Sequence, residues 1–155
     1  MDGEDLPTSK KIEATPIGIV RRLNSDEDIK DKSLISKIVI DEGFSQALDG
    51  IEDFSHILVI FWMHQITANE KTVLHVHPRG RSDVPLVGVF ATRSPRRPNP
   101  VGLTLVELVE RDANVLWVRG IDAFDETPVL DIKPYDDWDS VGDFKVPEWL
   151  KRLNK

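Results

Sequence analysis

The sequence is organised around one stretch, which reads Gly88-Val89-Phe90-Ala91-Thr92-Arg93-Ser94-Pro95-Arg96-Arg97-Pro98-Asn99-Pro100-Val101-Gly102. The alternating pattern over residues 86–92 predicts a strand, and a second apolar pattern begins at Val101. Between them, three prolines fix φ and remove amide donors, and each restricts the residue before it. We therefore expect a stiff loop whose three arginines lose little conformational entropy when they bind an anion. The alternative is a surface turn whose arginines are simply solvated.

Short strand patterns follow one another along most of the chain. They cover residues 15–22, 34–40, 55–64, 72–77, 86–92, 101–110, 115–121 and 129–132. A helical turn is expected at 44–48, and Pro147 precedes a short helix expected at 148–153. Many short strands with little helix predict a mainly β fold, a closed or nearly closed small β-barrel with short peripheral helices.

Composition narrows the class of protein further. A chain of 155 residues suits one domain, expected at 13–155 after a flexible N-terminal segment at 1–12. Without cysteine it has neither disulfides nor thiolate metal ligands, and its longest apolar run, 57–63, is too short to span a bilayer. We expect a soluble, cytoplasmic protein. The net charge of −7 argues against non-specific nucleic-acid binding, yet five arginines and one acidic residue lie between Arg79 and Arg97.

Residues 90–103 resemble the signature of the TsaA-like family, also called the TrmO family. Three further blocks, at 16–18, at 50–57 with 61–65, and at 125–135, resemble other parts of the family pattern and come in its order. The family consists of S-adenosylmethionine-dependent tRNA methyltransferases. The resemblance implies a homodimeric β-barrel with active sites near the subunit interface. It also implies methylation of the exocyclic nitrogen of threonylcarbamoyl-adenosine, which lies next to the anticodon in the tRNA anticodon stem-loop.

The resemblance also implies which residues form the site. Those expected at the S-adenosyl-L-methionine are His64, Gln65, Arg93, Leu103, Glu126, Thr127, Pro128 and Val129. Those expected at the substrate are Arg79, Arg81, Arg97 and Asn99. Glu126 stands where the family usually has glycine, so this residue must widen the turn or point outward if the backbone approaches the adenine closely.

Proton removal requires a base, and Tyr135 with Asp131 and Lys133 is the catalytic group that we expect. The three alternate along an extended run, so they can share one face, where Lys133 would favour the phenolate of Tyr135. The alternative is an Asp131–Lys133 ion pair that only anchors the strand.

Two other functions remain open at this level. The chain could be a non-catalytic β-barrel module that binds RNA or another anion through its arginine loop. His75 and His77 could also belong to a metal-dependent hydrolase. We expect no metal, because further spaced ligands are missing, and expect this pair to join Arg79 and Arg81 at an RNA-facing edge.

Overall fold

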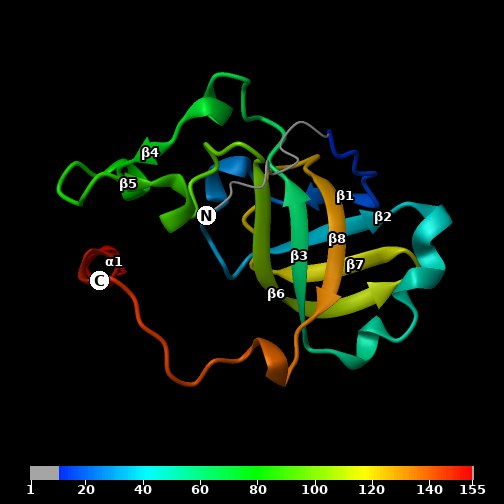
Figure 1. Cartoon of the computed structure of the whole chain (residues 1–155). Helices are drawn as coiled ribbons and strands as arrows, with labels where there is room; N and C mark the ends of the chain where they lie inside the picture. The colour runs from blue at the N-terminus through cyan, green and yellow to red at the C-terminus, as the bar shows by residue number, and fades with distance from the viewer. Residues whose placement is uncertain (1–10, 155) are drawn as a thin grey trace, which may run out of the picture.

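Six strands of the protein close into a barrel. In this computed structural model, which describes residues 11–154, they follow the order β1-β2-β7-β6-β3-β8, and β8 returns to β1 (Figure 1). All neighbouring pairs are antiparallel. Closure pairs every strand on both sides, so the barrel presents no open strand edge. The mainly β class and the closed barrel are confirmed.

The elements have the following bounds. The barrel strands are β1 Gly18–Arg22, β2 Ile35–Ile40, β3 His56–Trp62, β6 Val101–Asp112, β7 Val115–Arg119 and β8 Pro128–Pro134. A separate ribbon consists of β4 His75–Val76 and β5 Val87–Gly88. The described residues contain one α-helix, α1 Glu148–Leu153. A 3-10 helix of seven residues lies at Glu42–Leu48, and single 3-10 turns lie at Asp26–Asp28, Ile51–Asp53, Glu70–Thr72, Pro78–Gly80, Val89–Ala91 and Asp137–Asp139.

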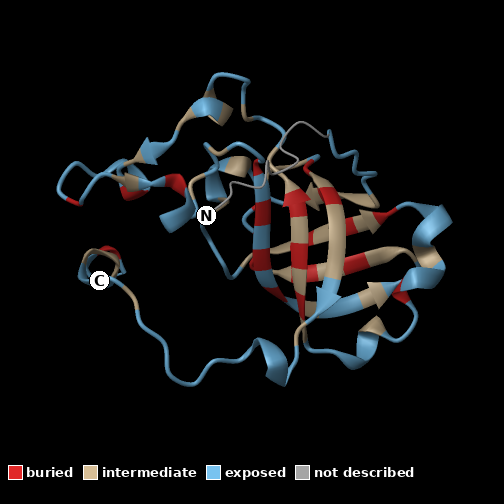
Figure 2. Cartoon of the chain, in the orientation of Figure 1, coloured by how far each residue is buried: buried red, intermediate tan, exposed pale blue. Residues whose placement is uncertain are grey.

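The core fills the inside of the barrel. Burial alternates along β3 and along the first half of β6, because successive strand residues point to opposite faces (Figure 2). On β6, Thr104 and Val106 point inward, whereas Leu103 and Leu105 are 49% and 45% exposed on the outer face. The barrel therefore carries an apolar stripe outside as well as an apolar core inside.

A second body of structure, the side lobe, lies beside the barrel. We define it as residues 66–98 together with α1. After β8 an extended strap, residues 136–147, leaves the barrel and carries α1 back to the β4–β5 ribbon (Figure 1). Leu153 of α1 is buried, as are Pro78 and Val84 of the lobe. On the strap, by contrast, Trp138 is 95% exposed.

Two expected strands are wrong in extent. The strand expected at 86–92 ends at Gly88, and Val89–Ala91 form a 3-10 turn closed by Thr92, whose amide and hydroxyl both donate to the Val89 carbonyl. The strand expected at 72–77 is reduced to His75–Val76. The reason is pairing, because β4 and β5 bond only to each other in the sheets of the described chain and not to the barrel. The expected C-terminal helix is confirmed.

The ends of the chain bear on two further expectations. Of the flexible segment expected at 1–12, residues 1–10 lie outside the described residues, and Lys11 and Ile12 belong to no helix or strand. The single domain at 13–155 stays a prediction. Within residues 11–154 no helix combines the length and the apolarity that crossing a membrane requires.

Candidate functional site

The proline-arginine loop between β5 and β6 is braced by its own side chains. The Thr92 hydroxyl accepts from the Ser94 amide at 3.1 Å, and the Ser94 hydroxyl accepts from the Arg96 amide at 3.3 Å. Arg97 folds back and donates to the carbonyls of Thr92 and Ser94, both at 3.3 Å, with its guanidinium 5.9 Å from the ring centre of Phe90. Arg97 therefore braces the loop, and the substrate contact expected of it stays a prediction.

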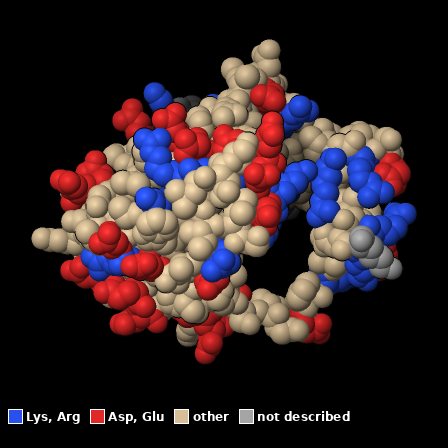
Figure 3. Space-filling model, turned by 180° about the vertical axis from the view of Figure 1, so that it is seen from behind, with Lys and Arg blue, Asp and Glu red and all other residues tan. Residues whose placement is uncertain are grey.

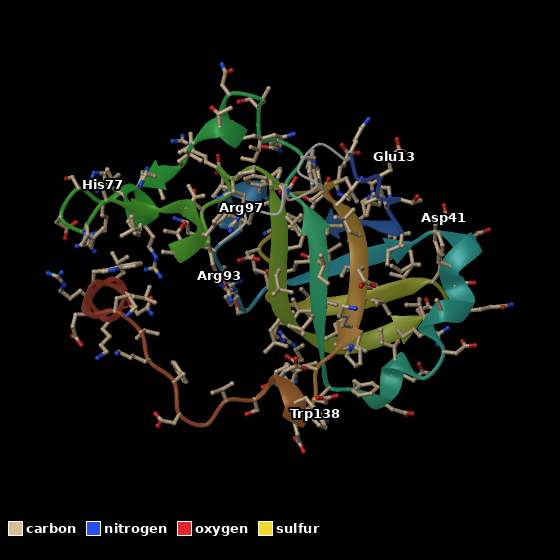
Figure 4. The ribbon with its side chains drawn as sticks, viewed as in Figure 1. Glu13, Asp41, His77, Arg93, Arg97 and Trp138 are labelled. Atoms are coloured by element: carbon tan, nitrogen blue, oxygen red, sulfur yellow. The ribbon has the colours of Figure 1, made fainter. Side chains whose placement is uncertain are left out.

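Arg93 differs from Arg97. No hydrogen bond or ion pair of its side chain occurs between residues 11 and 154, and the residue is exposed. Both arginines lie where the barrel meets the side lobe (Figure 4). Arg93 is thus a guanidinium on a stiff loop with its donors available for a ligand.

A first cavity of about 680 Å³ opens beside this loop, within the size range of small-molecule sites. Six of the residues expected at the cofactor or the substrate line it, namely Gln65, Arg93, Arg97, Asn99, Leu103 and Thr127. Most of the remaining wall is apolar, including Ile29, Phe90 and Phe124. A cation, a few amide and hydroxyl groups and an apolar wall fit a nucleoside that carries a carboxylate.

The other residues expected at the cofactor do not line this cavity. His64 contacts a residue of its wall, with Nδ1 3.4 Å from the hydroxyl of Thr127. Val129 is fully buried in the barrel core, and Pro128 begins β8. Glu126 adopts a φ of 63° and points outward to an ion pair with Arg21 at 3.0 Å. A positive φ at this position explains physically why glycine would suit it.

No member of the expected catalytic group lines this cavity, and Tyr135 lies at the other end of the barrel, beside His56. Asp131 and Lys133 form an ion pair at 3.1 Å on β8, and the ring of Tyr135 packs edge-on against His56 at 6.5 Å. His56 begins β3, whereas Phe61, near the end of β3, lines the first cavity. Seven strand residues span about 20 Å. Tyr135 therefore lies far from the cavity of its own chain, whereas Asp131 pairs with Ile60 nearer the cavity end of β3.

A second cavity, of about 1410 Å³, adjoins the first. It lies between the β4–β5 ribbon, the proline-arginine loop and α1. Both cavities are lined by Phe90, Thr92, Arg93, Pro95 and Asp122. Arg93 and Asp122 therefore lie in the wall that the two cavities share.

Asp122 is the site residue that the sequence analysis missed. It follows β7 in the connection to β8, its Oδ1 accepts a short hydrogen bond from the hydroxyl of Thr104, and its Oδ2 lies 3.1 Å from Nζ of Lys32. Lys32 also donates to the Gly120 carbonyl at 3.1 Å. The carboxylate is therefore fixed at the shared wall. A local signal was present, since Asp122 ends an apolar strand pattern, but nothing in the sequence brings it to Arg93.

The loop from 23 to 34 is pinned to the same region, which brings Ile29 and Lys30 to the cavities. Oδ1 of Asp26 accepts from the Asp125 amide at 2.9 Å and lies 3.4 Å from Nε of Arg22. Ile29 lines the first cavity and Lys30 the second. Three loops distant in sequence thus converge on one end of the barrel.

The two arginines expected at an RNA-facing edge, Arg79 and Arg81, make hydrogen bonds within the protein. Arg79 lines the second cavity, and its guanidinium donates to the Leu153 carbonyl at 2.6 Å. Arg81 donates twice to Asp83, at 2.9 and 2.5 Å, which lowers the pKa of Asp83 and raises that of Arg81. Arg81 does not line either cavity.

One histidine of the expected pair has a backbone partner. Nδ1 of His77 lies 2.9 Å from the Val84 carbonyl, and both His75 and His77 line the second cavity. Across residues 11–154 no group of three or more His, Cys, Asp or Glu side chains is placed to hold a metal ion. The expectation of no metal stays a prediction.

Charge is distributed unevenly over the molecule. Lys and Arg side chains gather on the side lobe and along its border with the barrel, while acidic side chains are frequent over the barrel (Figure 3). Arg96 at this border is 3.3 Å from Glu70, whose pKa is lowered mainly by hydrogen bonds from the amide and hydroxyl of Thr67, with a smaller effect of Arg96. A local cationic surface on an acidic protein favours an anionic partner at the two cavities.

Comparison with known proteins identifies the family of the chain. Residues 27–139 match the family model described as the tRNA-methyltransferase O N-terminal domain. The chain belongs to this family. A probable S-adenosyl-L-methionine-binding protein of Methanothermobacter thermautotrophicus is 47% identical over 138 residues, which cover 85% of this chain and 96% of that protein. A mouse tRNA (adenine(37)-N6)-methyltransferase is 42% identical over 108 residues, 70% of this chain but 23% of its own length.

Solved structures of TrmO share the fold. One crystal structure of TrmO superposes with a TM-score of 0.71 at 34% identity, covering 88% of this chain and 64% of that one. The crystal structure of TrmO from Pseudomonas aeruginosa gives 0.70 at 32% identity, again over 88% of this chain and 62% of its own. The present chain thus spans a little under two thirds of these TrmO chains, and the resemblance to the TrmO family is confirmed.

Proposed function

We propose that the protein transfers a methyl group from S-adenosyl-L-methionine to an exocyclic nitrogen of a tRNA base. The observation that carries this proposal is the pair of adjoining cavities with Arg93 and Asp122 in their shared wall. Methyl transfer needs a donor and an acceptor held together in fixed geometry, and positioning of this kind lowers the barrier by several kcal/mol. Membership of the TrmO family supports the same reaction.

The first cavity would hold the cofactor. Arg93 would pair with the cofactor carboxylate, Leu103 would form an apolar wall for the adenosine, and Gln65 and Thr127 would supply hydrogen bonds. When bound, the cofactor would supply the methyl group, so the protein needs no nucleophile of its own. The stiff loop fixes Arg93 before the ligand arrives, which reduces the entropy lost on binding.

The acceptor that we propose is threonylcarbamoyl-adenosine next to the anticodon. This base carries a carboxylate, whose charge is complementary to the cationic side chains of the second cavity. It also lies in an RNA loop whose bases are accessible to a protein. The name of the mouse relative, which specifies the N6 position of adenine 37, supports this choice. A tRNA substrate is also what supports the cytoplasmic placement expected from the sequence.

Asp122 would receive the proton of the acceptor nitrogen. A general base must be within hydrogen-bond reach of that proton, and Asp122 lies in the wall where the two ligands would meet. Thr104 and Lys32 hold its carboxylate, and a fixed carboxylate needs no rearrangement during the reaction. In a single chain this role fits Asp122 better than Tyr135, because of the length of β3 that separates Tyr135 from the cavity.

In a homodimer, the Tyr135 group of one chain would lie at the cavity of the partner chain. The outer face of β6 exposes Val101, Leu103 and Leu105, an apolar stripe that runs between the cavity end and the Tyr135 end of the barrel. A two-fold axis that lies in the interface and crosses β6 near Leu103 would place the Tyr135 end of one chain over the cavity end of the other. The proposal of an active site near a subunit interface rests on this stripe.

The decisive experiment is mass spectrometry of tRNA nucleosides after incubation with protein and S-adenosyl-L-methionine. We expect a methyl group on threonylcarbamoyl-adenosine, and no product on tRNA that lacks the threonylcarbamoyl group. Arg93→Ala should weaken cofactor binding in calorimetric titration. A wild-type protein that binds tRNA but neither binds the cofactor nor forms product would instead be the non-catalytic binding module.

A further inference from the structure

The C-terminal helix forms one wall of the second cavity. Trp149 and Leu150 of α1 line it, opposite the ribbon residue His75 and the loop residues Arg93 and Arg96. The matched family domain ends at residue 139, so this wall lies outside it. The strap thus brings a tryptophan from beyond the family domain to the border of the proposed site.

The helix is fixed in place by the lobe. A helix of six residues is not stable alone in water, so its position depends on tertiary contacts. Leu153 is buried, and Arg79 donates to its carbonyl at 2.6 Å and to the side chain of Asn154 at 2.7 Å. Arg79 has a φ of 54°, an uncommon backbone conformation for a side-chain-bearing residue. These contacts hold Trp149 at the cavity.

The lining of this cavity is cationic. Lys30, Arg79, Arg93 and Arg96 contribute to it, against the single carboxylate of Asp122. Arg79 is engaged with α1 and Arg96 with Glu70, whereas no side-chain partner of Lys30 or Arg93 occurs among residues 11–154. Cations around an aromatic side chain are the combination that binds single-stranded nucleic acid, where phosphates meet the charges and bases stack on rings.

We infer that Trp149 is a stacking platform for a base that flanks the methylated nucleotide in the tRNA loop. This inference rests on the proposed function, because the target base is taken to lie at the shared wall with Asp122. The second cavity, at about 1410 Å³, is about twice the volume of the first, 680 Å³, so it has room for more than one nucleotide. Loop bases that are splayed from their neighbours stack on aromatic side chains in this way.

The test uses an anticodon stem-loop RNA oligonucleotide as the binding probe and whole tRNA for turnover. Trp149→Ala should weaken binding of the stem-loop about ten-fold or more, the effect expected for loss of one stacked base, and leave the affinity for S-adenosyl-L-methionine unchanged. Trp138→Ala is the matched control, because Trp138 lies on the strap, 95% exposed and away from the labelled arginines (Figure 4). It should bind RNA as the wild type does.

Trp149→Phe provides a second readout that does not depend on the stability of the alanine variant. It keeps an aromatic ring and should retain most of the RNA affinity, but the quenching of tryptophan fluorescence by RNA should disappear. Equal RNA affinity in wild type and Trp149→Ala, or undiminished quenching in Trp149→Phe, would overturn the inference. If RNA binding depends on Trp149 but no variant, wild type included, methylates tRNA, the stacking site stands and the proposed reaction fails.

Discussion

The barrel and the side lobe are built on different principles. The barrel has six strands paired on both sides and a core whose central residues, such as Ile38, Val59 and Leu116, are fully buried. The lobe has a ribbon with two residue pairs, 3-10 turns and a six-residue helix held by Arg79 and Leu153. The proposed site lies where the two meet. A closed barrel is rigid enough to hold one wall, and the irregular lobe can supply side chains that regular strands would not present.

The largest effect that we expect is on the rate of methyl transfer and concerns Asp122 at this border. Asp122→Asn removes the negative charge while keeping the shape, and should lower the single-turnover rate about 100-fold or more, as loss of a general base does. Asp131→Asn is the matched control, because Asp131 is paired with Lys133 and lines neither cavity, and it should retain most activity. The measurement is single-turnover methylation of tRNA. If Asp131→Asn is slow and Asp122→Asn reacts at the wild-type rate, the general base belongs to the Tyr135 group and not to Asp122.

A smaller effect tests the packing of the barrel. A Cβ at Gly102 would lie 2.3 Å from the buried ring of Phe61, whereas a Cβ at Gly142 on the strap meets nothing within 4 Å. Overpacking of this kind costs about 1–3 kcal/mol, so Gly102→Ala should lower the free energy of unfolding by that amount. Gly142→Ala should leave it nearly unchanged. Urea denaturation checks both, and equal stability of the two variants would mean that the barrel wall is softer than its packing indicates.

The smallest effect concerns the strained turn before β8. Glu126 has a φ of 63°, so Glu126→Gly relieves left-handed strain but loses the exposed ion pair to Arg21. The relief is about 1 kcal/mol and the surface pair contributes less, so we expect a small rise in melting temperature. Arg21→Ala, which breaks the pair without relieving strain, should not raise it. A lower melting temperature for Glu126→Gly would show that the ion pair outweighs the strain.

Local patterns predicted the strands well and the side-chain partners poorly. The strand predicted at 101–110 lies within β6, because a strand alternates whatever its neighbours are. The strand expected at 86–92 failed after Gly88, because a strand also needs a partner to bond to. The same limit applies to the site, where Asp122 became visible only through its contacts with Thr104 and Lys32.

The sequence by itself determined a small β-barrel, a stiff loop with arginines and membership of a methyltransferase family. These features depend on hydrophobic period, on the fixed φ of proline and on motif order, all of which act locally along the chain. Tertiary structure decided which arginine is available, since Arg79 is bonded to α1, Arg97 to its own loop and Arg93 to neither. It also decided the distance of Tyr135 from the cavity and the approach of Trp149 to it. Those placements follow from strand pairing and helix docking between distant segments, which no local rule encodes.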